Sequence, residues 1–212
     1  MDLYGFFRSS TSYRLRIAMA LKGLDYRLHP VSLPKMEHRT ADYLSVNPQG
    51  LVPALVVDGQ AFTQSLAIIE YLDETHPEPP LLPADPAARA RVRAFAQIVG
   101  CDIHPLNNVR VLKYLQTRWN LSEQDRNEWY GHWIAAGFAD LEAHLGQHGG
   151  GGRFAFGDTP GLAEICLVPQ VANAQRFSCD LSAYPGCLRV FEACMALDAF
   201  ERTHPRHQPD AT

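Results

Sequence analysis

The first strand and helix can be recognised in residues 3–24, LYGFFRSSTSYRLRIAMALKGL. Leu3–Phe7 is a short aromatic and apolar run, which is typical of a strand. Four hydroxyl residues follow at 9–12, and the apolar residues after them recur with the i, i+3, i+4, i+7 spacing of a helix. Gly23 is a natural place for that helix to stop. The chain therefore opens with a strand, a hydroxyl-rich turn and a helix.

The pattern continues in the next fifty residues or so. Tyr26–Leu33 can form a second strand. Ala54–Val57 and Gln60–Thr63 flank Asp58-Gly59, a strong signal for a hairpin turn, and Ser65 can cap a further helix. The order β-α-β, a helix or loop, then β-β-α predicts an α/β domain.

A proline-rich linker and a helical domain are expected next. The segment 76–86, HPEPPLLPADP, holds five of the 15 prolines, and proline continues neither a helix nor a sheet ladder. We therefore expect an α/β domain over 1–80 and an all-α domain over 81–212. The expected helices run over 86–116 with an interruption at Pro105, over 122–145 from a capping box, over 162–174 and over 185–197. The tail 204–212 is expected to be poorly ordered.

Composition narrows the functional classes. The net charge of -4 and pI near 6.1 argue against general nucleic-acid binding, which favours a basic surface. No apolar run has the length of a membrane span, and the N-terminus lacks the pattern of a secretory signal. The odd number of scattered cysteines suits a reduced, cytoplasmic protein. The five are Cys101, Cys166, Cys179, Cys187 and Cys194.

The turn from Arg8 to Ser12 is the first candidate site. A helix N-terminus offers free N–H groups and partial positive charge, and neighbouring hydroxyls can donate to a thiolate. Because the turn has no cysteine, the thiol it would activate belongs to a ligand. The alternative is simple N-capping by serine.

Two further turns suit a peptide ligand. If the Val52–Pro53 bond is cis, Val52 can offer its N–H and C=O to a peptide. The alternative is an ordinary loop proline. The start of the next helix, Thr63-Gln64-Ser65, suits a carboxylate, and again the alternative is a cap.

Metal and serine-hydrolase chemistry are poorly supported. His144 and His148 are spaced i, i+4, but the sequence suggests no third ligand and contains no HExxH motif, so we predict no metal. There is no GxSxG motif to support a serine nucleophile.

Five stretches of the chain resemble the zeta class of the glutathione transferases, and they extend over nearly its whole length. They are FRSSTSYRLRIAMALKG at 7–23, NPQGLVPAL at 47–55, TQSLAIIEYL at 63–72, LVPQVANAQRF at 167–177 and HPRHQPD at 204–210. The resemblance implies a thioredoxin-like N-terminal domain, a helical C-terminal domain, glutathione as cofactor and a homodimer.

The resemblance also implies which residues bind glutathione. They are Ser9, Ser10 and Thr11 near the sulfur, Val52 and Pro53 at a cis peptide that pairs with the cysteinyl backbone, Gln64 and Ser65 at the γ-glutamyl end, His38 near the glycyl end, and His104 and Asn108 beside the sulfur or the substrate. The class often has cysteine where this chain has Thr11, and threonine where it has Gly161. A protein thiol at that turn is therefore not expected to be essential, and glycine is expected to cap the helix acceptably.

The activity implied by the resemblance is cis–trans isomerisation of a small dicarboxylate, maleylpyruvate to fumarylpyruvate, in the gentisate route of aromatic degradation. Thiolate addition would make the double bond single, and rotation and elimination would follow. Arg8, Arg110 and Arg176 are the candidates to hold carboxylates and developing charge, although Arg110 would point away from His104 and Asn108 on a straight helix. Arg14 and Arg16 are expected to be charges on the surface of the first helix. The alternatives are isomerisation of maleylacetoacetate, a conjugating transferase or dehalogenase, and a non-catalytic module.

Overall fold

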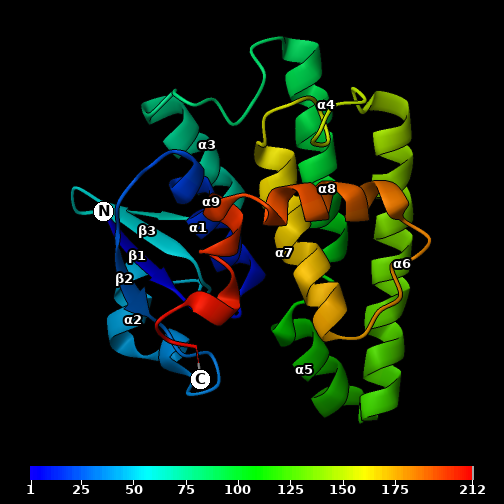
Figure 1. Ribbon diagram of the computed structural model, residues 1–212. Coiled ribbons are helices and arrows are strands. Elements are labelled where there is room, and N and C mark those ends of the chain that lie inside the picture. The colour runs from blue at the N-terminus through cyan, green and yellow to red at the C-terminus, as the bar shows by residue number, and fades with distance from the viewer. Residues whose placement is uncertain (212) are drawn as a thin grey trace. The chain divides into compact units, whose positions relative to one another are not determined.

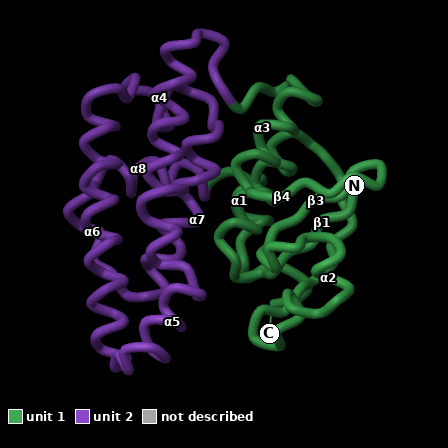
Figure 2. The backbone as a smooth tube through the Cα atoms, turned by 180° about the vertical axis from the view of Figure 1, so that it is seen from behind, with its two compact units in different colours: residues 1–81, 196–212 green, residues 82–195 purple. Residues whose placement is uncertain are grey.

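The computed structural model describes residues 1–211, which form two compact units (Figures 1 and 2). The first unit contains Met1–Leu81 together with the residues from Ala196 onward, and the second contains Leu82–Met195. The sequence predicts a change of domain at residue 80, but it does not predict that the chain returns to the first unit at Ala196. Among residues 1–211, no helix is both long enough and apolar enough to cross a membrane.

A four-stranded sheet forms the centre of the first unit. Its strands are β1 (Asp2–Gly5), β2 (Arg27–Pro30), β3 (Ala54–Val57) and β4 (Gln60–Thr63), in the spatial order β2-β1-β3-β4. β1 pairs parallel with β2 and antiparallel with β3, and β3 pairs antiparallel with β4. The predicted hairpin is confirmed, because Asp58 and Gly59 both have the positive φ, 49° and 79°, that a tight turn of this kind needs.

Helix α1 (Ser10–Leu21) makes the parallel crossover from β1 to β2, and α2 (Ala41–Val46) and α3 (Ser65–Thr75) are the other α-helices of residues 1–81. α1 is buried nearly all round, because α3 packs on it and so does the short helix α9 (Asp198–Glu201). Arg14 and Arg16, expected on the helix surface, are therefore only 2% and 1% exposed. That expectation was wrong because the second covering segment is nearly two hundred residues away in the sequence.

The C-terminal segment is ordered where the structure describes it. Tyr13 donates its hydroxyl to the carbonyl of Phe200 at 3.0 Å, and the Asp210 carboxylate accepts from the N–H of Phe7 at 3.0 Å. A short 3-10 helix, Pro205–His207, lies between these contacts. The predicted disorder of the tail is thus corrected for residues 204–211, because Asp210 binds the turn after β1 and His204 packs on Tyr13 of α1.

The second unit is built from helices. It contains α4 (Pro86–Gln97), a π-helical turn (Ile98–Ile103), α5 (Val109–Trp119), α6 (Glu123–His148), α7 (Leu162–Arg176) and α8 (Pro185–Met195). The capping box at Ser122 is confirmed, with Asp125 as its partner. The interruption expected at Pro105 is wider than predicted, because the chain leaves the α-helix after Gln97 and re-enters one only at Val109.

The start of α7 depends on a buried carboxylate. Glu164 is 2% exposed, and its two oxygens accept from the N–H of Gly161 at 2.7 Å and that of Ala155 at 2.8 Å. Burial raises the pKa of this carboxyl above its usual range, and the backbone hydrogen bonds oppose that effect. Gly161 has no side chain to cap the helix. Of the two hydrogen bonds of a capping box, only the one from the Gly161 N–H to the Glu164 side chain is therefore formed.

Candidate functional site

The hydroxyl-rich turn is the N-terminus of α1. Ser9 is the N-cap, with φ -70° and ψ 121°, and its Oγ accepts from the N–H of Ser12 at 3.3 Å. The capping alternative is therefore observed. The same hydroxyl makes a second interaction, because Ser9 Oγ also lies 2.8 Å from Thr11 Oγ1. Ser9 and Thr11 are both partly accessible, whereas Ser10 is buried.

Thr11 joins this turn to the loop before β3. Its hydroxyl donates to the carbonyl of Val52 at 2.9 Å. Because the Thr11 proton is committed to Val52, the hydrogen bond between the two hydroxyls must be donated by Ser9. Protons are thus directed from Ser9 to Thr11 and from Thr11 to Val52, at the positive end of the α1 dipole.

Two side chains hold the loop that carries Val52 by donating to the carbonyl of the preceding residue, Leu51. The Leu51 oxygen accepts from Asn47 Nδ2 at 2.7 Å and from the Tyr43 hydroxyl at 2.5 Å. Both donors are buried, Asn47 at 1% exposure. The Val52–Pro53 bond is cis, as the sequence reasoning expected. Two buried side chains thereby fix the orientation of Val52.

The third turn lies at the start of α3. Gln64, not Ser65, is the N-cap, and it has a φ of 69°, which is rare for a residue with a side chain. Its Nε2 donates to Gln49 Oε1 at 3.0 Å. No side chain caps α3, so its first N–H groups remain available to a ligand carboxylate. The expectation that Ser65 caps this helix was therefore wrong.

Ser65 is instead the first residue of α3 and is buried. Its Oγ lies 3.4 Å from Nη1 of Arg14, a buried cation that local sequence patterns did not reveal. A positive charge beneath a helix N-terminus adds to the dipole there and favours an anion.

His38 belongs to a short 3-10 helix, Glu37–Arg39, and is half-buried. This segment packs tightly on Gly50, whose φ is 60°. A Cβ at Gly50 would lie 2.9 Å from the His38 carbonyl and 2.8 Å from Arg39 Nη1. Glycine is therefore required there by conformation and by space. The contact places His38 beside the loop that leads to Val52.

The remaining candidate in the first unit is Arg8. It is exposed, and its guanidinium carbon lies 5.7 Å from the ring centre of Phe6 and 5.2 Å from that of Phe7. Stacking on the two rings limits the directions that the guanidinium can take.

In the second unit, His104 and Asn108 contact each other. Asn108 Nδ2 lies 3.3 Å from His104 Nε2, and Asn108 Oδ1 accepts from the N–H of Arg110 at 3.0 Å because Asn108 is the N-cap of α5. Arg110 is in the first turn of α5 and exposed. The three residues therefore do not share one straight helix, so the objection based on helical register does not apply.

Arg176 ends α7. It is exposed, and its guanidinium carbon lies 4.5 Å from the ring centre of Phe177. Phe177 stacks on Tyr130, with ring centres 3.8 Å apart. The Tyr130 carbonyl accepts from Asn107 Nδ2 at 3.1 Å, so the turn before α5 and the end of α7 are joined through α6.

Some residues of the site escaped sequence reasoning. Tyr43 and Asn47 act on the backbone of the Val52 loop, and Tyr130 supports the Arg176 end of α7. The signal that could have revealed Asn47 is its position four residues before Leu51, which allows a side chain to bond a nearby carbonyl within the loop. Tyr130 offered no local signal.

No group of three or more histidine, cysteine or acidic side chains is placed to hold a metal ion within residues 1–211. His144 is engaged elsewhere, because its Nε2 lies 3.0 Å from the carbonyl of Arg91 and its ring contacts Phe95 and Phe156.

Comparison with known proteins identifies the family. Models of the N-terminal and C-terminal domains of glutathione S-transferase match residues 8–75 and 126–193. Over 211 residues and 100% of both chains, the sequence is 53% identical to a maleylpyruvate isomerase of Ralstonia sp. It is 50% identical to a maleylacetoacetate isomerase of Pseudomonas aeruginosa, over 99% of this chain and 98% of the other.

Comparison with solved structures points to the same family. The structure matches a holo maleylpyruvate isomerase, described as a bacterial glutathione S-transferase of the zeta class, with a TM-score of 0.98, 52% identity and 100% coverage of both chains. A maleylacetoacetate isomerase of Methylobacterium extorquens AM1 with bound malonate and GSH gives a TM-score of 0.96, with 41% identity and 100% coverage of both. The thioredoxin-like sheet, the helical second unit and these matches show that the chain belongs to the glutathione transferase family, in its zeta class.

Proposed function

We propose that this chain is a glutathione-dependent cis–trans isomerase that converts maleylpyruvate to fumarylpyruvate. The observation that carries the proposal is the chain of hydroxyls from Ser9 through Thr11 to Val52 at the N-terminus of α1. It supplies hydrogen-bond donors for a ligand thiolate in a chain that is 53% identical to a maleylpyruvate isomerase.

The residues present fit glutathione. The uncapped N-terminus of α3, with Gln64 and Ser65, suits the γ-glutamyl carboxylate, and Val52 suits the cysteinyl backbone. Ser9 and Thr11, with the buried Ser10 between them, would surround the sulfur. His38 would lie toward the glycyl end. Each of these groups is a donor or a backbone group of the kind that a small acidic peptide needs.

Glutathione, when bound, supplies the thiolate that adds to the cis alkene and is later expelled, so that the cofactor is regenerated. Ser9 has the one proton in the hydroxyl chain that can be redirected to the sulfur while Thr11 keeps its bond to Val52. We therefore assign Ser9 as the thiolate donor and Thr11 as the residue that orients it. His104 and Asn108 would border the sulfur or the substrate.

The substrate requires cations. Maleylpyruvate has two carboxylates, and the planar fork of arginine binds carboxylates in a bidentate manner. Arg8 and Arg176 are exposed guanidinium groups oriented by stacking on aromatic rings, and Arg110 is an exposed residue in the first turn of α5. They would hold the carboxylates and stabilise negative charge that develops on the substrate oxygen.

Purified protein mixed with maleylpyruvate, with and without a catalytic amount of glutathione, tests the proposal. We expect fumarylpyruvate to form rapidly only when glutathione is present, while the glutathione concentration stays constant. Turnover that consumes glutathione stoichiometrically would indicate a conjugating transferase or dehalogenase. Absence of turnover on both maleylpyruvate and maleylacetoacetate would refute the isomerase assignment and leave a binding module.

The second candidate is isomerisation of maleylacetoacetate, which has the same chemistry on a longer substrate. It is favoured by the 50% identity to a maleylacetoacetate isomerase. The ratio of kcat/KM values on the two acids decides between them. A higher value for maleylpyruvate would place the enzyme in the gentisate route of aromatic degradation.

We also propose a cytoplasmic homodimer. All five cysteines are free, and Cys166, Cys187 and Cys194 are buried, which suits a reducing compartment. Light scattering coupled to size exclusion tests the dimer, for which a mass near that of one 23.6 kDa chain would be the contradicting result.

A further inference from the structure

The turn between β1 and α1 carries Arg8, and two side chains bind the backbone of the residue before it, Phe7. The N–H of Phe7 donates to the Asp210 carboxylate at 3.0 Å, and the carbonyl of Phe7 accepts from Arg16 Nη2 at 3.0 Å. The peptide groups on both sides of Phe7 are therefore fixed, and the second of them is the one that joins Phe7 to Arg8.

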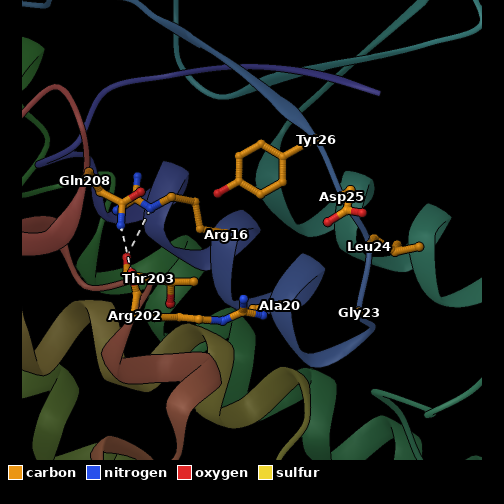
Figure 3. A pocket seen from close by; sticks show the side chains of 9 residues that line it. All are labelled: Arg16, Ala20, Gly23, Leu24, Asp25, Tyr26, Arg202, Thr203 and Gln208. Carbon is orange, nitrogen blue, oxygen red and sulfur yellow. Dashed lines mark hydrogen bonds between the residues drawn. The ribbon is translucent and has the colours of Figure 1, made fainter.

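Arg16, which holds the Phe7 carbonyl, is itself bound to the C-terminal segment. The side chain is 1% exposed, and its Nε donates to the Thr203 carbonyl at 3.1 Å (Figure 3). Burial lowers the pKa of Arg16 to about 10, and the Asp210 carboxylate is among the groups whose charge opposes that effect. Arg16 and Asp210 thus form one cluster around the Phe7 backbone, and residues 203–210 complete it.

The neighbouring residue Phe6 is held within the turn instead. Its N–H donates to Ser12 Oγ at 3.3 Å, and its carbonyl accepts from the N–H of Ser9 at 3.0 Å. Ser9 is also the N-cap of α1 and contacts Thr11 through its hydroxyl. The hydroxyls proposed to activate the thiol therefore have local support, whereas the backbone of Phe7 is held by the C-terminal segment and by Arg16.

The guanidinium of Arg8 takes its direction from the rings of Phe6 and Phe7. Its central carbon lies 5.7 Å from the first ring centre and 5.2 Å from the second, and the two rings meet edge to face with their centres 4.8 Å apart. Both phenylalanines are buried, at 8% exposure. A displacement of the Phe7 backbone would move one of these rings and the point from which the Arg8 side chain starts.

We propose that Asp210 is a positioning residue for Arg8. By fixing the backbone of Phe7, it determines where the Arg8 guanidinium meets a carboxylate of the substrate. Asp210 acts through Phe7 rather than by touching the substrate. The inference rests on the proposed function in one respect, the role of Arg8 in holding the dicarboxylate. It makes the C-terminal segment a determinant of substrate affinity as well as of the fold.

A double-mutant cycle between Asp210 and Arg8 tests the inference. The Kd of malonate, a small dicarboxylate, is measured by calorimetry on the full chain, with S-methylglutathione present to fill the proposed glutathione site. Asp210→Ala should weaken malonate binding about tenfold in the native chain and cause no further loss in Arg8→Ala. An equal loss in both backgrounds would show that Asp210 only supports the fold, and the proposal would be overturned.

The same cycle separates this inference from the proposed function. If Arg8→Ala weakens malonate binding and Asp210→Ala does not, Arg8 keeps its role and the positioning by Asp210 is wrong. If Arg8→Ala leaves the Kd unchanged, the role of Arg8 in holding the dicarboxylate is wrong as well.

Steady-state kinetics provides a second measurement. Asp210→Ala should raise the KM for the dicarboxylate about tenfold and leave the KM for glutathione unchanged, because Ser9 keeps its local support. Asp210→Asn retains an oxygen for the Phe7 N–H and should raise the first KM only about threefold. Asp198→Ala is the matched control, because it removes an exposed carboxylate of the same segment that pairs with Arg202, and it should change neither KM. A rise of both KM values by the same factor in Asp210→Ala would contradict the proposal.

Discussion

The hydroxyl of Thr11 and the carbonyl of Val52 are 2.9 Å apart, although the two residues are 41 positions apart in the sequence. This hydrogen bond links the turn proposed to activate the thiol to the loop proposed to bind the cysteinyl backbone. It also fixes the direction of the proton that Ser9 shares with Thr11. Substitutions at the two hydroxyls should therefore have different consequences.

Ser9→Ala should lower kcat about a hundredfold, because it removes the donor assigned to the thiolate. It should also reduce the free energy of unfolding by about 1 kcal/mol, because Ser9 caps α1. Steady-state kinetics measures the loss of kcat, ultraviolet absorbance of the bound thiolate against pH measures the pKa of the thiol, and urea unfolding measures the loss of stability. A normal thiol pKa in the variant complex would show that Ser9 is only a cap.

Thr11→Val should lower kcat/KM by about tenfold, the size expected for loss of one hydrogen bond that orients another. Thr11→Ser keeps the hydroxyl and should retain most of the activity. Steady-state kinetics on both variants checks this order. If Thr11→Val were as damaging as Ser9→Ala, Thr11 itself would be the thiol donor.

Asn47→Ala should raise the KM for glutathione, because the Leu51 carbonyl would lose one of the two donors that hold the Val52 loop. Loss of one hydrogen bond to this part-buried carbonyl, which keeps Tyr43 as its other donor, should also lower the free energy of unfolding by about 1 kcal/mol. Titration with glutathione and urea unfolding measure the two effects. Asn127→Ala, at an exposed site on α6, is the control and should alter neither.

Arg176→Ala should raise the KM for the dicarboxylate about tenfold and leave the KM for glutathione unchanged. Arg176→Lys should recover little, because lysine lacks the planar fork and its stacking on Phe177 is weaker. Arg118→Ala, at an exposed position on α5, provides the charge-matched control. Unchanged kcat/KM for the diacid in Arg176→Ala would exclude a role in holding the substrate.

Glu164 predicts a pH dependence of stability. Its pKa is raised in the folded state by burial, so the fold binds this proton more tightly than the unfolded chain does. Its contribution to stability is fully present below 4.5, the ordinary pKa of a glutamate side chain, and is lost as the pH rises through the pKa of the folded state. The difference in unfolding free energy between the native chain and Glu164→Gln should therefore decrease as pH rises above 4.5. Urea unfolding at several pH values measures it, and a difference that is constant or grows would contradict the assignment.

Local patterns predicted much of the fold. The hairpin at Asp58-Gly59 and the cap at Ser122 are present because each depends on residues close in the sequence. Arg14 and Arg16 were misjudged because helical periodicity cannot show that a segment from the far end of the chain covers the second face of α1. The same limit applies to the site, where each hydroxyl could be located but the contact between Thr11 and Val52 could not.

The return of the chain to the first unit has a consequence for biosynthesis. Synthesis proceeds from the N-terminus, and domains generally fold as their residues emerge. Arg16 and Tyr13 find their partners, the carbonyls of Thr203 and Phe200, only in the last part of the chain to be made. All residues of the helical unit, Leu82–Met195, are synthesised before this last part of the chain. The unit that begins first on the ribosome is therefore completed last.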